Sequence, residues 1–243
     1  MRAPRVFIDA PLVAGTVLEL PDDAALHLRR VLRLAEGAAL RVFNGRGGEW
    51  QAAIARVGRN RVEVRIAEHD PVERESPIAI TLAQGISRAE RMDYTLQKAV
   101  ELGVSAIAPV LTTRSVVQLG EERRSRRAAR WTKVIRSACE QCGRNRLPRL
   151  LPIQGLDAWL AADPPGAKWT LSGHGEQRLS AIDAAPQTLV LLVGPEGGLA
   201  PEEEVQARQA GYAALWLGPR TLRTETAAVA ALAAIQGLWG DLR

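Results

Sequence analysis

Apolar and polar residues alternate in short runs through the first part of the chain. Four of these runs, at residues 5–9, 39–45, 49–57 and 61–69, have the period-two spacing of half-buried β-strands and are separated by Gly, Asn and charged residues. A stretch with helical spacing at 22–34 interrupts them. The pattern predicts a small β-barrel with one helical insertion.

The pattern changes after the segment DPVERESP at residues 70–77, which carries two prolines and alternating charges. Beyond it, strand-like apolar runs alternate with amphipathic helices, the order typical of a mostly parallel α/β sheet covered on both faces. We therefore place the domain boundary in this segment and expect domains at 1–72 and 73–243. The expected strands are 78–86, 105–112, 167–172, 188–194 and 213–218, and the expected helices are 88–103, 121–141, 201–211 and 224–239.

Composition limits the class of protein. The chain has 243 residues, 47% of them hydrophobic, which suffices for the cores of one or two globular domains. It contains no stretch typical of a signal peptide or a membrane span, so we expect a cytoplasmic protein that does not enter a membrane. The two cysteines, Cys139 and Cys142, fit a reducing compartment. Their spacing resembles half a zinc site, but without a second cysteine pair we expect no bound metal.

Charge suggests a polyanionic partner. The net charge is +5, and basic side chains neutralise phosphates, although a GC-rich genome also raises the arginine content. The distribution is more informative, because residues 114–149 contain eleven basic and three acidic residues. The helix expected at 121–141 has Arg123, Arg127 and Arg130 on one face. That face is either a solvated surface or a contact for RNA, and the basic loop after the helix favours RNA.

Two loops after expected strands carry the candidate chemistry, because ligands bind beyond the carboxyl ends of strands in open α/β sheets. In GPEGG at 194–198, three glycines allow the backbone to approach a flat ligand closely. Glutamates at 202–204 occupy the next helical turn, where they would repel a triphosphate. The spacing also fits neither common nucleotide motif. We therefore expect a less anionic ligand with an adenosine-like ring.

The second loop, LGPRTLRTET at 217–226, enters an alanine-rich helix whose expected N-cap is Thr224 or Thr226. Charged residues here lie between two apolar elements, where they need a partner or a ligand. These residues are Arg220, Arg223 and Glu225. In the purely structural alternative, Arg223 and Glu225 pair with each other or with Glu196.

The two loops together resemble the signature of the SPOUT superfamily and, within it, of the bacterial 16S rRNA uracil-N3 methyltransferases. That family has a GPEGG turn followed, at similar separation, by LG-x-R-x-LR-x-ETA. Three further stretches are similar to the same family: HLRRVLRLAEGA, RMDYTLQKAVELGVSAIAPVLTTRSV and EQCGRNRLPRL. The resemblance covers nearly the whole chain and is weakest at 153–187.

The resemblance implies a PUA-like RNA-binding β-barrel followed by a SPOUT methyltransferase domain, whose mostly parallel sheet has a C-terminal trefoil knot. It also implies a homodimer and the cofactor S-adenosylmethionine, which the loops of the knot would hold in a bent shape. Carried over residue by residue, the cofactor contacts are Leu171, Gly194, Glu196, Gly197, Leu217, Gly218, Leu222 and Arg223. Positions 172–175 depart from the family pattern and receive no role.

The implied reaction is methyl transfer to N3 of a uridine in small-subunit ribosomal RNA. Because uracil N3 is protonated and a poor nucleophile, a carboxylate is expected to act as general base and a guanidinium to stabilise the charge on the ring. We expect Arg223 in the second role and Glu225 or Glu196 in the first. Arg114, Gln141 and Arg144 are expected near the target nucleotide. Other expected RNA contacts are Arg2, Arg5, Arg29, Arg30, Arg123 and Arg127.

Other functions stay open from the sequence. A related SPOUT enzyme would act on another rRNA or tRNA position or on a ribose 2′-OH. A non-enzymatic RNA-binding protein would explain the charge, but it has no need of two glycine-bearing loops at neighbouring strand ends. A nucleotide-dependent enzyme is the third alternative.

Overall fold

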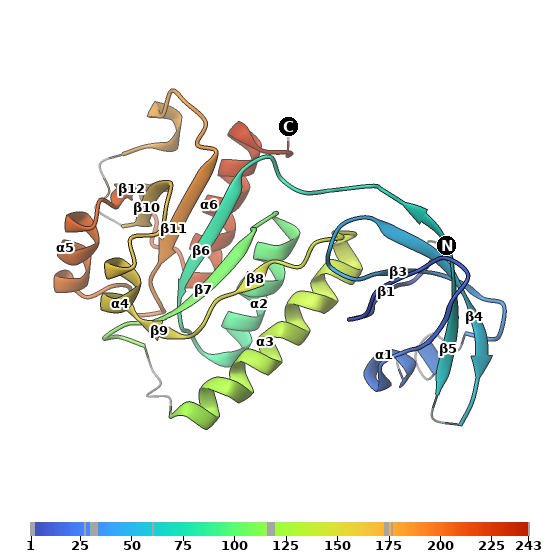
Figure 1. The fold of residues 1–243 in the computed structure, drawn as a ribbon. Helices are drawn as coiled ribbons and strands as arrows, with labels where there is room; N and C mark the ends of the chain where they lie inside the picture. Colours follow the sequence, from blue (N-terminus) through green and yellow to red (C-terminus); the bar gives the residue numbers. More distant parts are fainter. Residues whose placement is uncertain are drawn as a thin grey trace. The chain divides into compact units, whose positions relative to one another are not determined.

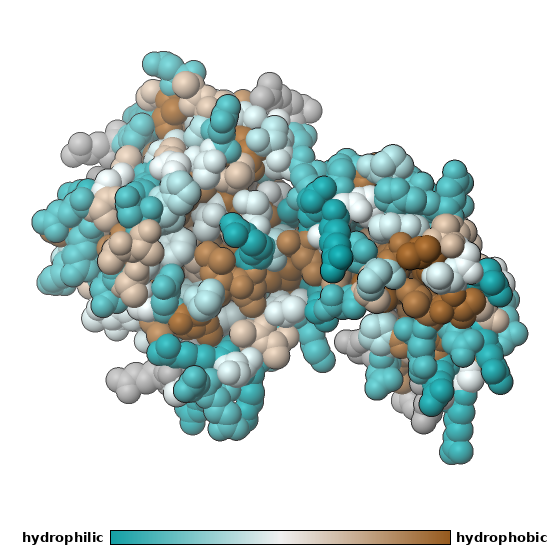
Figure 2. Space-filling view, viewed as in Figure 1, coloured by the Kyte–Doolittle hydropathy of each residue, from teal (hydrophilic) through white to brown (hydrophobic). Residues whose placement is uncertain are grey.

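The computed structural model describes residues 3–26, 28–29, 34–59, 61–115, 120–172, 175 and 177–242. The chain divides into two compact units (Figure 1): the first consists of Met1–Glu75 with Cys139–Leu147, and the second of Ser76–Ala138 with Pro148–Arg243. Hydrophilic residues cover most of the surface of both units on the face shown in Figure 2. Within the described residues, no helix is long and apolar enough to cross a membrane.

The first unit contains a mixed five-stranded sheet with the order β1-β3-β4-β5-β2. β1 pairs in parallel with β3, and the other neighbours are antiparallel. Alternate residues of the long strands face a core that includes the fully buried Val42, Val62 and Val64. Its elements are β1 (Arg5–Phe7), β2 (Val17–Glu19), α1 (Asp22–Leu26), β3 (Ala39–Phe43), β4 (Glu49–Val57) and β5 (Val62–Asp70).

The second unit is built on a parallel sheet with the strand order β12-β10-β11-β6-β7-β8, and β9 also pairs with β7. The central strands are continuous apolar runs, as expected for strands that are covered on both faces. The strands are β6 (Ala79–Gly85), β7 (Ala106–Leu111), β8 (Arg149–Leu150), β9 (Gln154–Gly155), β10 (Ala167–Leu171), β11 (Thr188–Val193) and β12 (Ala213–Leu215). The predicted α/β class with a mostly parallel sheet is confirmed.

Helices cover this sheet from two sides (Figure 1). α4 (Leu156–Ala161) and α5 (Pro201–Gln209) pack over one face through a cluster that includes Trp159, Ala207 and Tyr212. α2 (Ala89–Glu101) packs on α6 (Thr224–Trp239), and α3 (Glu121–Cys142) buries Trp131 and Ile135. A short 3₁₀ helix, η2, spans Leu179–Ala181.

The structure adds elements that the sequence pattern did not predict: β2, β8, β9, α4 and η2. β12 ends at Leu215, earlier than expected. Of the helix expected at 22–34, α1 covers the first part, and residues 27 and 30–33 lie outside the described residues. The trefoil knot stays a prediction.

One local expectation is wrong. Neither Thr224 nor Thr226 caps α6, because Arg223 occupies the N-cap position and makes no side-chain capping bond. The Thr224 hydroxyl instead donates to the carbonyl of Gly194, 2.6 Å away. A tertiary hydrogen bond to the GPEGG turn has therefore replaced the local cap.

Candidate functional site

The carboxyl ends of four parallel strands define the candidate site. β12, β10, β11 and β6 are neighbours in this order, so the loops that follow them leave the same edge of the sheet. The two glycine-bearing loops predicted to carry the chemistry follow β11 and β12. The sheet therefore brings together segments that are separated in the sequence, as ligand sites of open α/β sheets require.

A cavity of about 400 Å³ lies at this edge, beside β10 and β12. This volume is within the range of about 300–1,000 Å³ that is usual for small-molecule sites. Its wall combines leucine side chains with backbone and hydroxyl groups, which suits a flat ring with a polar edge. The lining residues are Leu171, Ser172, Leu215, Leu217, Gly218, Pro219, Arg220, Thr221, Leu222 and Ala227.

Four of the predicted cofactor contacts line this cavity: Leu171, Leu217, Gly218 and Leu222. Gly218 has a φ of +114°, a conformation that favours glycine strongly over residues with a side chain. The other predicted contacts, Gly194, Glu196, Gly197 and Arg223, are not among the lining residues. They lie on the GPEGG turn and at the start of α6.

The GPEGG turn packs tightly against the end of β6. A Cβ atom on Gly85 would lie 2.6 Å from the nitrogen of Pro195, and one on Gly194 would lie 2.8 Å from the carbonyl carbon of Gly198. Thr224 joins the turn to α6: its hydroxyl donates to Gly194 and accepts from Nε2 of Gln84 at 3.0 Å. The two predicted loops therefore form one connected structure.

The loop after β7 also contacts the turn. Glu203 is buried and accepts hydrogen bonds from the amides of Thr113, at 2.7 Å, and Ala200, at 2.8 Å. Arg114 donates to the carbonyls of Gly197, at 2.7 Å, and Leu199, at 3.1 Å. Glu203 is therefore a structural link within the protein. Arg114, expected near the target nucleotide, is exposed and rests on the GPEGG turn.

Two of the candidate catalytic residues, Glu196 and Glu225, share an ion-pair partner. Arg91 of α2 lies 3.6 Å from Glu196 and 3.8 Å from Glu225, and Oε1 of Glu196 also accepts from the amide of Arg88 at 2.9 Å. The sequence reasoning missed Arg91. A signal was present, because a cation in the first turn of a helix is opposed by the helix dipole and so suggests an acidic neighbour.

Arg223 is the third candidate catalytic residue. It is exposed, as is Arg220, and the described part of the chain places no carboxylate within 4.0 Å of Arg223. The purely structural alternative, in which Arg223 pairs with Glu225 or Glu196, is therefore wrong within the described residues, because those carboxylates pair with Arg91. Arg223 follows Leu222, which lines the cavity.

The basic residues of α3 are partly neutralised. Arg126 pairs with Glu122, and Nε of Arg130 donates to Asp93 of α2 at 2.8 Å. The hydrogen bond to Asp93 raises the pKa of Arg130. The two residues on this helix expected to contact RNA remain accessible, since Arg123 is exposed and Arg127 half-buried.

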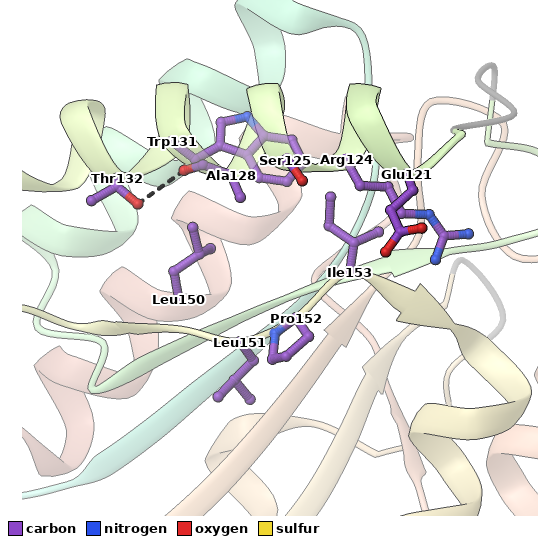
Figure 3. A pocket seen from close by; sticks show the side chains of 10 residues that line it. All are labelled: Glu121, Arg124, Ser125, Ala128, Trp131, Thr132, Leu150, Leu151, Pro152 and Ile153. Atoms are coloured by element: carbon purple, nitrogen blue, oxygen red, sulfur yellow. Dashed lines mark hydrogen bonds between the residues drawn. The ribbon is translucent and has the colours of Figure 1, made fainter.

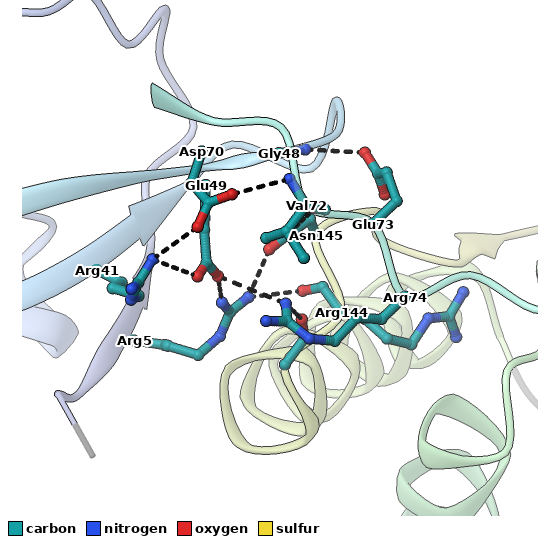
Figure 4. A network of polar contacts seen from close by, with 11 residues as sticks. Arg5, Arg41, Gly48, Glu49, Asp70, Val72, Glu73, Arg74, Arg144 and Asn145 are labelled. Atoms are coloured by element: carbon teal, nitrogen blue, oxygen red, sulfur yellow. Dashed lines mark hydrogen bonds and ion pairs between the residues drawn. The ribbon is translucent and has the colours of Figure 1, made fainter. Parts of the chain in front are cut away.

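In the first unit, two arginines expected to contact RNA are internal (Figure 4). The Arg5 side chain is 4% exposed and pairs with Glu49, and its Nη2 donates to the carbonyl of Arg144 and to Asn145. The Arg144 side chain is also 4% exposed and pairs with Glu75. Neither guanidinium is free to contact RNA in this structure.

Two other RNA candidates of the first unit are more accessible. Arg29 is half-buried and Gln141 is exposed, whereas Arg2 and Arg30 lie outside the described residues.

Cys139 is buried, and burial raises the pKa of its thiol to about 12. Among the described residues, no group of histidine, cysteine and acidic side chains is arranged to hold a metal ion.

A larger hollow of about 770 Å³ lies between α3 and the segment 150–153 (Figure 3). Its wall is mainly apolar, with Trp131 and Leu150 facing each other and Glu121 and Arg124 at one end. It lies away from the strand ends that carry the glycine loops. Size alone therefore does not make it the candidate site, because the loops predicted to carry the chemistry follow β11 and β12 instead.

Comparison with known proteins gives matches over almost the whole chain. A family model described as an RNA methyltransferase domain matches residues 74–236, and one described as an RNA methyltransferase PUA domain matches residues 20–67. The ribosomal RNA small subunit methyltransferase E of Buchnera aphidicola subsp. Schizaphis graminum is 31% identical over 99% of this chain and 98% of its own length. The Bacillus subtilis protein of the same name is 30% identical over 86% of this chain and 85% of its own.

Two solved structures are similar throughout. The ribosomal RNA small subunit methyltransferase E from Neisseria gonorrhoeae, bound to S-adenosylmethionine, is 42% identical and has a TM-score of 0.92, with 100% of both chains covered. The Legionella pneumophila protein Lpg2936, with the same cofactor bound, is 39% identical and has a TM-score of 0.96, with 99% of this chain and 100% of the other covered.

Proposed function

We propose that this chain, which belongs to the ribosomal RNA small subunit methyltransferase E family of RNA methyltransferases, transfers a methyl group from S-adenosylmethionine to N3 of a uridine in small-subunit ribosomal RNA. Methylation of ribosomal RNA with this cofactor follows from the family. The uridine N3 target is the finer part of the proposal, and it rests on the resemblance of the two glycine-bearing loops to the uracil-N3 branch.

The cavity at the ends of β10 and β12 fits the cofactor. Leu171, Leu217 and Leu222 provide an apolar wall for an adenine ring. Gly218, whose positive φ favours glycine, has no side chain and so lets the ring approach the backbone closely. We propose that these four residues hold the adenosine part and that the GPEGG turn, through Gly194 and Gly197, borders the methionine part. When bound, S-adenosylmethionine supplies an electrophilic methyl group on a sulfonium.

The residues around the GPEGG turn include a candidate general base and a guanidinium for the uridine that accepts the methyl group. Uracil N3 must lose its proton as the new bond forms, and the ring then carries negative charge on its oxygens. We propose that Glu225 or Glu196 accepts the proton and that Arg223 stabilises the charge. The exposure of Arg223 beside Leu222, without a carboxylate partner in the described chain, is consistent with a guanidinium that is available to a substrate.

RNA binding is proposed for both units. In the first unit, the PUA-type match supports a role in holding the ribosomal RNA, with Arg29 and Gln141 as described candidates and Arg2 and Arg30 as undescribed ones. In the second unit, Arg114, Arg123 and Arg127 are the candidates. Phosphate contacts of this kind position an RNA without reading its sequence.

We also propose a homodimer that forms through the second unit. The exposed apolar side chains of Leu238 and Leu242, at and beyond the end of α6, are consistent with a covered surface. Light scattering would then give a mass near twice that of the 26.3 kDa chain. A monomeric mass across the working concentration range would contradict this part of the proposal.

One observation carries the functional proposal: a small-molecule cavity and a glycine turn lie at neighbouring strand ends within a chain of this family. The test measures methyl transfer from labelled S-adenosylmethionine to 16S rRNA, 23S rRNA and tRNA in parallel, with free RNA and assembled small subunits. Label is expected on 16S rRNA. Label confined to tRNA or 23S rRNA would overturn the proposed substrate.

A variant pair links transfer to the cavity. Leu222→Asp places a charge in the cavity wall and is expected to abolish both S-adenosylmethionine binding in calorimetry and transfer. Val205→Asp, at an exposed position on α5, is the matched control and should leave both unchanged. Saturable ATP binding that displaces S-adenosylmethionine would favour a nucleotide-dependent enzyme instead.

A further inference from the structure

Arg91 connects two elements of the candidate site. It lies in the first turn of α2, directly after the loop that leaves β6, the strand beside β11. Its Nη1 lies 3.6 Å from Oε1 of Glu196 on the GPEGG turn, and its Nε lies 3.8 Å from Oε1 of Glu225 on α6. One guanidinium therefore faces both carboxylates that are candidates for the general base.

The position is unfavourable for a cation unless acidic partners are present. The first turn of a helix carries partial positive charge, which disfavours a cation there. Within the described chain, Arg91 is the cation that lies within 4.0 Å of Glu196 and of Glu225. All three side chains are at least two-thirds buried, so the attraction between them is screened less than at an open surface.

Each carboxylate also has an oxygen without a hydrogen-bond partner. Oε2 of Glu196 and Oε2 of Glu225 are buried and make no hydrogen bond. The same holds for Oε1 of Gln84, in β6, and for the hydroxyl of Ser87, just after β6. Gln84 and Ser87 are both fully buried. Buried polar atoms without partners are uncommon and call for an explanation. Three of these four atoms are acceptors only, and each of the three lacks a donor.

We propose that Arg91 is a positioning residue for methyl transfer. It pairs with Glu196 and with Glu225 and fixes the orientation of their side chains, so that the carboxylate of one of them can receive the N3 proton of the acceptor base. This inference rests on the proposed function and adds to it the residue that sets the geometry of the base. Without the guanidinium, the two carboxylates repel each other and lose their fixed orientation.

The step balances without another reactant. The N3–H bond breaks and its proton passes to the carboxylate of Glu196 or Glu225. The electron pair left on N3 forms the bond to the methyl carbon, and the carbon–sulfur bond breaks with its electrons remaining on sulfur. The positive charge of the sulfonium is thereby removed, and the carboxylate becomes a neutral acid. No oxidant or metal takes part in this scheme.

The test compares Arg91→Gln, Arg91→Lys and wild type in single-turnover methyl transfer to small-subunit ribosomal RNA at saturating cofactor. Binding of S-adenosylmethionine by calorimetry and the melting temperature are measured on the same samples. Lys98→Gln is the matched control, because Lys98 forms a comparable ion pair with Glu101 at the other end of α2, at 2.8 Å.

Arg91→Gln is expected to slow single-turnover transfer by about tenfold or more, since general acid–base catalysis contributes about 10²–10⁴-fold. The cofactor Kd should stay within about threefold of wild type, because Arg91 does not line the cavity and the loss falls on the transition state. Arg91→Lys restores a cation and should recover part of the rate, and Lys98→Gln should behave as wild type.

Two results would overturn the inference. One is a rate for Arg91→Gln equal to that of wild type. The other is a parallel loss of rate, cofactor affinity and melting temperature that Arg91→Lys does not relieve, since that pattern marks a structural link between α2 and α6. If wild type itself transfers no methyl group to ribosomal RNA, the proposed function fails, and this inference fails with it.

Discussion

The hydroxyl of Thr224 is the connection between the two glycine-bearing loops, and its removal has a calculable cost. Thr224→Val replaces the hydroxyl with a methyl group of similar size, and both residues are β-branched, so their helix propensity is nearly equal. The change deletes the donor to the Gly194 carbonyl and the acceptor for Nε2 of Gln84. Thr224 is 6% exposed and Gln84 is fully buried, so water cannot replace either bond readily.

The expected magnitude follows from these two partners. A buried polar group left without its hydrogen bond costs about 1–3 kcal/mol. Gln84 retains a bond to the carbonyl of Gly85 at 3.0 Å, whereas the Gly194 carbonyl keeps only a long bond of 3.5 Å from Nε2 of Gln84, so most of the cost arises at Gly194. We expect the free energy of unfolding of the second unit to fall by about 2 kcal/mol. At about 2–4 °C per kcal/mol for a unit of this size, the melting temperature should fall by about 4–8 °C.

The assay is thermal unfolding followed by circular dichroism, with Thr224→Ser as the matched variant. Serine keeps the hydroxyl and loses only a methyl group, which costs about 1 kcal/mol at a buried position. Thr224→Ser should therefore melt closer to wild type than Thr224→Val does. Equal melting temperatures for Thr224→Val and wild type, or a larger loss for Thr224→Ser, would refute the role given to this hydrogen bond.

Three further predictions concern other parts of the chain. Glu49→Gln leaves the buried Arg5 guanidinium poorly compensated, so urea unfolding should show the first unit destabilised by about 3–5 kcal/mol; an unchanged midpoint would contradict this. Gly218→Val forces a β-branched residue to a φ of +114°, at a cost of about 1–3 kcal/mol, and calorimetry should show S-adenosylmethionine affinity at least about tenfold weaker. Burial raises the pKa of Cys139 from 9.0, and of Tyr212 from 10.0, to about 12. Because the unfolded chain loses these protons first, stability should fall as the pH rises from about 9 towards 12, by at most about 1.4 kcal/mol per pH unit for each group. Tyr212→Phe should make this decline shallower, and an identical decline would show that the tyrosine does not contribute.

The sequence predicted the elements whose pattern is long and regular. β6, β11, α2, α3 and α6 follow from apolar runs or helical spacing that extend over several residues. β8 and β9 contain two residues each, and α4 contains six. A period cannot be recognised over so few positions. These short elements exist because the parallel sheet supplies partners for them, which the local sequence does not reveal.

Only part of the candidate site was predicted, because some of its contacts join residues that are distant in the sequence. Glycine turns after apolar strands are visible in the sequence, and the family resemblance of these loops implied Leu217, Gly218 and Leu222 as cofactor contacts, which line the cavity. Pairing between distant charges was not visible. Arg5 and Arg144 are arginines, a residue type that often contacts RNA, yet the fold buries both against carboxylates. Arg91 was overlooked because its two partners lie more than a hundred positions further along the chain.

The measurement that tests the central claim most directly identifies the methylated atom. Small-subunit ribosomal RNA lacking the modification is incubated with the protein and methyl-labelled S-adenosylmethionine, digested to nucleosides and analysed by mass spectrometry. The account predicts that the label appears in 3-methyluridine. Label on a ribose 2′-oxygen or on another base would contradict it.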